Sequence, residues 1–164
     1  MTVSTVYTYS KPVAKWRRQR ETAVELPVDL FRSAAPSGPS RGYVLVVDDC
    51  VSIADILGRM LMEMGYEVAQ TTSGRDALEL AWLTRPDLIL LDTSLPDVSS
   101  QVVYATLRQK ARTRLIPIIL MSIFDEATER QAGFHAAEAD FMMKPILYEA
   151  LRRQVGRRMR SAMA

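Results

Sequence analysis

The feature that most constrains the fold is an alternation of short apolar runs with amphipathic windows from Gly42 onward. Most of the runs are too continuously apolar to have a face open to water, which is typical of strands buried on both faces of a parallel sheet. Five strands, each followed by a helix after a short connection, require right-handed crossovers and helices on both sides. The sequence therefore predicts an α/β protein with a doubly wound parallel sheet. The expected strands are residues 43–47, 66–69, 87–91, 116–121 and 140–143.

The expected helices lie between these runs and carry local start and stop signals. In the first, Ser52 and Asp55 are spaced as a capping pair, and Gly65 is placed to end the helix. Ser73 stands at the expected start of the second helix. The remaining windows are residues 99–111, 125–136 and 146–160.

Composition divides the chain into a folded domain and shorter flanks. Residues 31–42 are rich in Ser, Pro and Gly, which indicates a linker. Residues 1–41 hold seven Lys or Arg against three Asp or Glu, so they are basic overall. We expect residues 1–41 to form a flexible basic arm and linker, residues 42–160 the domain, and residues 161–164 a tail.

Several classes of protein are excluded or disfavoured. Cys50 is the single cysteine, so no intramolecular disulfide can form, and one His with one Cys makes a poor zinc site. No apolar run approaches the roughly 20 residues of a membrane helix, and the first residues place their positive charges in the inverse order of a secretory signal, so we expect no export. These features favour a cytoplasmic protein. The absence of a Gly-rich loop after the first strand disfavours flavin and dinucleotide ligands.

Polar residues follow four of the five expected strands, at the edge where parallel sheets bind ligands. In chain order they are Asp48, Asp49, Asp92, Ser122 and Lys144. Three carboxylates in one crevice need a cation, and Mg²⁺ suits them because it takes oxygen ligands and keeps waters that a phosphate can replace. A phosphoryl group on or near Asp92 would use the Lys144 ammonium and the Ser122 hydroxyl as donors. The set indicates a carboxylate nucleophile beside a metal ion.

These residues resemble those of the response-regulator receiver domain of two-component signalling, over about residues 42–160. The spacings are 43 residues from Asp49 to Asp92, 30 from Asp92 to Ser122, and 22 from Ser122 to Lys144. The resemblance implies a flavodoxin-like, five-stranded sheet of order 2-1-3-4-5. It also implies a single-domain response regulator, not an enzyme, that receives a phosphoryl group from a sensor histidine kinase or phosphotransfer protein and then binds a downstream protein.

The resemblance also implies a role for each site residue. Asp92 is the implied phosphoacceptor. The implied Mg²⁺ ligands are Asp48, Asp49, Asp92 and the backbone carbonyl of Ser94. The implied phosphate-binding residues are Ser122 and Lys144, and the implied switch residues are Phe141 and Ser122.

Three residues depart from the family's pattern. Ser100 and Glu138 stand where Gly is usual, and Ile123 stands where a small residue is normal. They remove no chemical group from the site, but they leave open a constitutive receiver-fold scaffold with weakened switching. An Asp-nucleophile phosphatase is disfavoured because Ser94 occupies the position of its second Asp.

Two expectations concern residues outside this set. Phe124, two residues after Ser122, is placed to shield Asp92 from water, so we expect a long-lived aspartyl phosphate. The arginines of the terminal window fit the solvated face of a helix better than a nucleic-acid site. The sequence leaves homodimerisation open.

Overall fold

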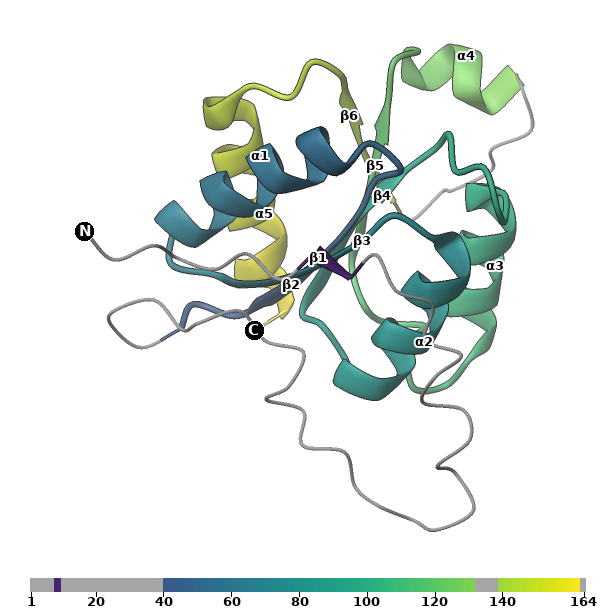
Figure 1. Cartoon of the computed structure of the whole chain (residues 1–164), viewed down its shortest axis with the longest axis horizontal. Coiled ribbons are helices and arrows are strands. Elements are labelled where there is room, and N and C mark those ends of the chain that lie inside the picture. The colour runs from purple at the N-terminus through teal and green to yellow at the C-terminus, as the bar shows by residue number, and fades with distance from the viewer. Residues whose placement is uncertain (1–7, 10–39, 132–138, 163–164) are drawn as a thin grey trace, which may run out of the picture.

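A parallel β-sheet separates two layers of helices in the computed structural model, which describes residues 8–9, 40–131 and 139–162 (Figure 1). The central strands lie in the order β3-β2-β4-β5-β6, and every pairing is parallel. This is the predicted 2-1-3-4-5 order. The strands are β2 (Tyr43–Val47), β3 (Glu67–Thr71), β4 (Leu88–Asp92), β5 (Ile118–Ser122) and β6 (Asp140–Met143).

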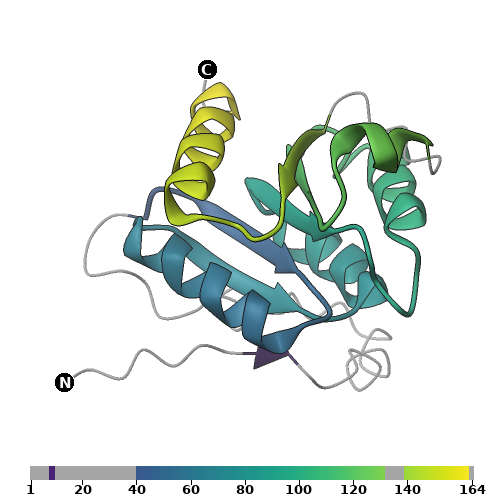
Figure 2. The ribbon, with the colours of Figure 1, turned by 90° about the horizontal axis from the view of Figure 1, so that it is seen from above.

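Helices cover both faces of the sheet (Figures 1 and 2). Helices α1 (Val51–Glu63) and α5 (Tyr148–Ala162) pack on one face, and α2 (Gly74–Thr84) and α3 (Ser100–Gln109) pack on the other. Helix α4 (Glu126–Gln131) follows β5 and has no buried side chain. It begins where the sequence predicts, but residues 132–136 of that window lie outside the described part of the chain.

Successive residues of each strand belong to two different cores, as expected for a doubly covered sheet. In β2 the side chains of Val44 and Val46 pack with α1 and α5. Those of Tyr43, Leu45 and Val47 pack with α2 and α3. All five residues are at most 3% exposed, so the strand has no face open to water.

The helix signals are confirmed in part. Gly65 follows Met64, the C-cap residue of α1, and adopts a positive φ of 89°, a conformation that glycine tolerates best, so it ends the helix as predicted. Ser73 caps α2 by accepting a hydrogen bond from the Asp76 N–H at 3.1 Å. The capping pair expected at Ser52 is wrong, because α1 already begins at Val51. The Asp48 carboxylate accepts the Cys50 N–H at 3.0 Å there instead.

A sixth strand, β1 (Thr8–Tyr9), extends the sheet beyond the five that the sequence predicts. It pairs in parallel with β3, with Thr8 opposite Gln70 and Tyr9 opposite Thr71. Two residues carry no periodicity, so the pattern could not reveal this strand. Residues 1–7, 10–39, 132–138 and 163–164, with Glu138 among them, lie outside the described residues, so the flexible arm and linker stay a prediction.

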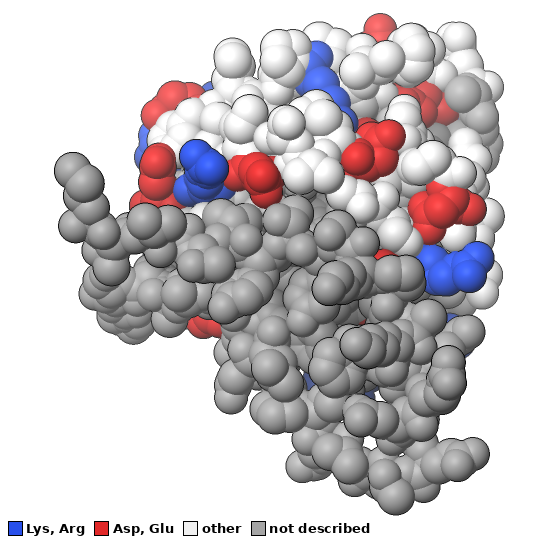
Figure 3. Space-filling model, viewed as in Figure 1, with Lys and Arg blue, Asp and Glu red and all other residues white. Residues whose placement is uncertain are grey.

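Acidic and basic side chains are interspersed among uncharged ones over the described part of the face in Figure 3. Within the described ranges no helix combines the length and apolar content that a bilayer crossing demands.

Candidate functional site

The sheet topology brings the predicted polar residues to one edge. Asp92 is the last residue of β4 and lies opposite Met121 of β5. Ser122 ends β5, and Lys144 follows β6 directly, where its backbone N–H donates to the Ser122 carbonyl at 2.6 Å. The neighbouring ends of β4, β5 and β6 therefore bring a carboxylate, a hydroxyl and an ammonium group close together.

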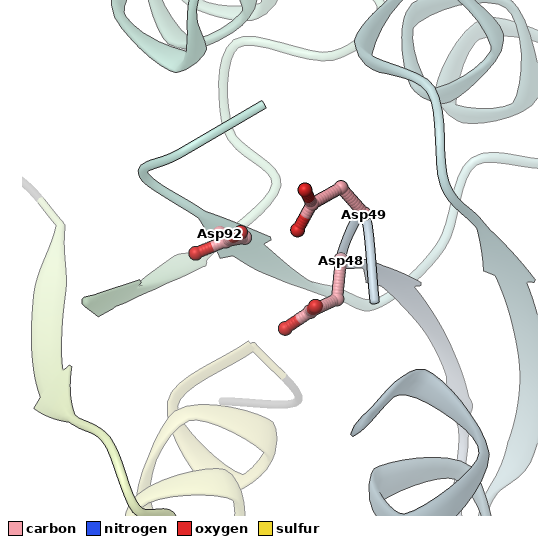
Figure 4. Close-up of side chains that lie close together, drawn as sticks. All are labelled: Asp48, Asp49 and Asp92. Carbon is pink, nitrogen blue, oxygen red and sulfur yellow. The ribbon is translucent and has the colours of Figure 1, made fainter. Parts of the chain in front are cut away.

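Asp48, Asp49 and Asp92 form a cluster of carboxylates at this edge (Figure 4). One oxygen of each carboxylate lies within 4.8 Å of the others. Asp48 and Asp92 are 0% and 2% exposed, whereas Asp49 is open to solvent. Two buried acids with one exposed acid give a site that an ion can enter from water.

Lys144 reaches into the cluster from the opposite side. Its Nζ lies 2.7 Å from Asp48 Oδ2 and 3.1 Å from Asp92 Oδ1. Burial alone would lower the pKa of Lys144, but the hydrogen bond and charge of Asp48, together with Asp92, raise it overall. The ammonium is therefore held in its charged form between two carboxylates.

One ammonium does not compensate three carboxylates. Burial raises the pKa of Asp92 above its usual value, and the nearby Asp48 charge adds to this effect. Lys144 and the backbone N–H of Ser94 act in the opposite direction without cancelling it. The remaining negative charge and the oxygen donors are what a hard dication requires, so these residues fit Mg²⁺. The carbonyl of Ser94 as a further ligand stays a prediction.

The Ser122 hydroxyl is engaged by the backbone of Phe124 and by Glu129, which the sequence did not single out. It is 1% exposed and accepts the Phe124 N–H at 3.0 Å. It donates to Glu129 Oε1, which also accepts from Thr93 Oγ1 at 2.8 Å. Thr93 follows Asp92 directly, but Glu129 could not be placed from sequence because the loop after β5 sets the position of α4.

Ser100, one of the departures from the family's pattern, also contacts the site. Its side chain is 1% exposed, and its hydroxyl donates to the backbone carbonyl of Asp92 at 2.5 Å. This bond ties the start of α3 to the end of β4. Among the other departures, Ile123 is 64% exposed, and its side chain does not fill the site.

We expect Ser100→Ala to lower the free energy of unfolding by about 1 kcal/mol, because it removes a buried hydrogen bond to the Asp92 carbonyl. Urea denaturation at neutral pH measures this change. Ser99→Ala is the neighbouring comparison, since the Ser99 hydroxyl makes a longer bond of 3.4 Å in an exposed position. Equal stability of wild type and Ser100→Ala would contradict the assigned bond.

Asp97 joins the loop after β4 to the start of α2. Its carboxylate accepts the Gly74 N–H at 2.9 Å, the Arg75 N–H at 3.1 Å and the Ser73 hydroxyl at 2.9 Å. Burial, the largest single influence, opposes ionisation, but these donors together outweigh it and lower the pKa of Asp97 to about 2. The carboxylate therefore acts as an anionic cap for α2.

We expect Asp97→Ala to lower the free energy of unfolding by about 1 kcal/mol at pH 7. A depressed pKa in the folded state means that the stabilisation is complete above the usual value of 3.8 and is lost as the pH falls toward 2. Thermal melts of both proteins between pH 7 and pH 2 should therefore converge. If the difference in melting temperature between wild type and Asp97→Ala stayed constant down to pH 2, the negative charge of Asp97 would not be the source of the stabilisation.

The fold and the site together define a class of protein. Residues 44–156 match the family described as "Response regulator receiver domain", and the chain belongs to this family. The family is one of signalling domains in two-component systems.

Particular relatives agree with this assignment. The chain is 35% identical over 108 residues to "Response regulator MprA" of Mycolicibacterium vanbaalenii, a match that covers 66% of this chain and 46% of that protein. It is 32% identical over 108 residues to "DNA-binding dual master transcriptional regulator RpaA" of Synechocystis, again over 66% of this chain and 45% of the relative. The chain thus spans less than half the length of these curated relatives.

Solved structures of receiver domains resemble the chain over most of their own length. Chemotaxis protein CheY4 of Vibrio cholerae has a TM-score of 0.65 at 28% identity, covering 70% of this chain and 96% of that one. The signal receiver domain of a histidine kinase from Syntrophus aciditrophicus has a TM-score of 0.67 at 30% identity, covering 73% and 91%. The predicted fold and family are confirmed.

Proposed function

We propose that this receiver domain accepts a phosphoryl group on Asp92 with the help of Mg²⁺. The observation that supports this most is the cluster itself, in which a buried Asp92 with a raised pKa lies beside two further acids and one ammonium. Asp48, Asp49 and Asp92 are the side chains that would hold the ion. When bound, Mg²⁺ would offset the negative charge of the acids and of the incoming phosphoryl oxygens.

The proposed reaction is an in-line phosphoryl transfer. An oxygen of Asp92 forms a bond to phosphorus while the bond from phosphorus to the donor breaks, and the bonding electron pair leaves with the donor nitrogen of a phosphohistidine. Lys144, held in its charged form at this position, would neutralise phosphoryl oxygens. The donor is a sensor histidine kinase or a phosphotransfer protein, the usual partners of this family.

We infer that the output is a change in protein binding, with Ser122 and Phe141 as the switch residues. Phe141 lies in β6 and is partly buried against the core beneath α2 and α3, where an aromatic ring can change its packing. A stand-alone, cytoplasmic regulator stays a prediction, and homodimerisation stays open. Ion pairs of Arg157 and Arg158 with Asp140 support a structural role for the α5 arginines over nucleic-acid binding.

Beryllofluoride, an analogue of a bound phosphoryl group, tests this proposal without a kinase. Titration of the full chain should show binding that requires Mg²⁺, together with a change in the spectra of residues near Ser122. Lack of any Mg²⁺-dependent binding would contradict the proposed function. Binding without a conformational change would favour the alternative of a constitutive scaffold, which the substitutions at Ser100 and Ile123 leave open.

The lifetime of the phosphorylated state is a separate prediction. The Phe124 side chain is 51% exposed in the loop that follows Ser122, and we expect it to limit the access of water to Asp92. Phe124→Ala should therefore shorten the half-life of the aspartyl phosphate several-fold. Loss of radiolabel over time measures it, with Ile123→Ala as the control, and equal half-lives would refute the shielding role.

A further inference from the structure

Glu129 links α4 to the site through two hydroxyl groups. Its carboxylate oxygen Oε1 accepts from Thr93 Oγ1 at 2.8 Å and from Ser122 Oγ. Thr93 directly follows Asp92, and Ser122 ends the neighbouring strand β5. Glu129 is partly buried, whereas every other residue of α4 is exposed, so this helix contacts the site through one side chain.

The one proton that the Ser122 hydroxyl can donate is already committed in this arrangement. A serine hydroxyl has one proton to donate, and Ser122 gives that proton to Glu129 while it accepts the Phe124 N–H at 3.0 Å. A phosphoryl group on Asp92 offers only acceptor oxygens, so Ser122 can bind it only by leaving Glu129. The same proton cannot serve both anions.

Charge adds to this competition. The site already holds three carboxylates against the ammonium of Lys144. Phosphorylation replaces the single charge of the Asp92 carboxylate with the close to two charges of the phosphoryl group, so it adds about one negative charge. Like charges at short range disfavour each other. Phosphorylation of Asp92 therefore disfavours the observed position of Glu129 in two ways. The phosphoryl group competes for the Ser122 hydroxyl, and its negative charge repels the Glu129 carboxylate.

We propose that Glu129 is a positioning residue that competes with the phosphoryl group for the Ser122 hydroxyl. In the unmodified protein it holds Ser122 away from Asp92 and fixes α4 beside β5. Modification of Asp92 breaks both bonds to Glu129 and releases α4. Release requires little free energy, because α4 is a six-residue helix with no buried side chain. This inference rests on the proposed function and adds a regulatory element to it.

Equilibrium binding of beryllofluoride at saturating Mg²⁺, followed by ¹⁹F NMR on the full chain, tests the competition. We expect Glu129→Gln and Glu129→Ala to bind beryllofluoride about tenfold more tightly than wild type, since a hydrogen bond to a charged acceptor no longer has to be broken. Glu126→Gln is the matched control. It removes one negative charge from the same helix, but Glu126 pairs with Arg130 at the surface and does not contact Ser122.

The direction of the change distinguishes the outcomes. A Glu129 that only supported the fold would give weaker binding when replaced, so a gain relative to Glu126→Gln supports the competition. Unchanged or weaker binding in both Glu129 variants, with wild type binding normally, would overturn this inference and leave the proposed function intact. If wild type itself bound no beryllofluoride, the proposed function would fail instead.

Amide hydrogen exchange supplies a second measurement. In wild type, saturation with Mg²⁺ and beryllofluoride should speed exchange in residues 126–131, and Glu129→Ala should show the faster exchange already without ligand. Unchanged or slower exchange of α4 on ligand binding would overturn the proposed release of this helix.

Discussion

Lys144→Met should lower the free energy of unfolding by about 3 kcal/mol in metal-free buffer. The substitution removes the ammonium that lies 2.7 Å from Asp48 and 3.1 Å from Asp92, and so leaves two buried carboxylates without their cation. Mg²⁺ should restore part of the lost stability. Phosphorylation by a small phosphodonor should slow by about 100-fold, because the cation that in the proposed function would face the phosphoryl oxygens is lost.

Chemical denaturation with and without Mg²⁺ measures the first effect, and incorporation of label from acetyl phosphate measures the second. Lys110→Met is the control, since Lys110 is exposed at the end of α3, away from the acidic cluster. If Lys144→Met were as stable as Lys110→Met without metal, the assigned ion pairs would not contribute to stability.

Asp92→Asn should have the opposite effect on stability and raise the free energy of unfolding at pH 7 without metal. Burial raises the pKa of Asp92 in the folded state, so its charged form is less favourable there than in the unfolded chain. Lys144 keeps Asp48 as a partner after the substitution. A neutral amide of nearly the same shape removes the unfavourable charge.

The sign of the pH dependence follows from the raised pKa. Wild type gains stability as the pH falls through the folded pKa of Asp92 toward the usual value of 3.8, because the folded state binds the proton more tightly. The advantage of Asp92→Asn should therefore shrink from pH 7 toward pH 4. Saturating Mg²⁺ at pH 7 should shrink it as well, since the ion binds wild type better. An Asn variant less stable than wild type at pH 7 without metal would contradict this electrostatic description.

The fold could be predicted from the sequence because its signals are local and strong. The uninterrupted apolar run Tyr43–Val47 implies burial on both faces, and the structure places its alternate side chains in two cores. Each strand is followed by a helix after a short connection, and this arrangement requires parallel strands. The sequence also predicted that three site residues lie close together, namely Asp92, Ser122 and Lys144. Each lies at the end of a strand, and the order of parallel strands in the sheet fixes which strand ends are neighbours.

Other features depended on loop geometry that no periodicity encodes. Glu129 reaches Ser122 only because the loop after β5 directs α4 toward the site. The hydroxyl of Ser100 fills a place where the family's usual residue has no side chain, and its bond to Asp92 became visible only in three dimensions. The sequence did not reveal that α1 begins at Val51, because its N-cap residue Cys50 has no side-chain capping bond and the Cys50 N–H is instead accepted by Asp48, a site residue.

Covalent modification of Asp92 can be observed directly by incubating the full chain with Mg²⁺ and acetyl phosphate and mapping the product by mass spectrometry. We expect a single phosphoryl group on Asp92 that is absent without Mg²⁺ and absent in Asp92→Asn. Modification at another residue with Asp92 untouched, or no modification together with no measurable affinity for Mg²⁺, would contradict the role assigned to this site.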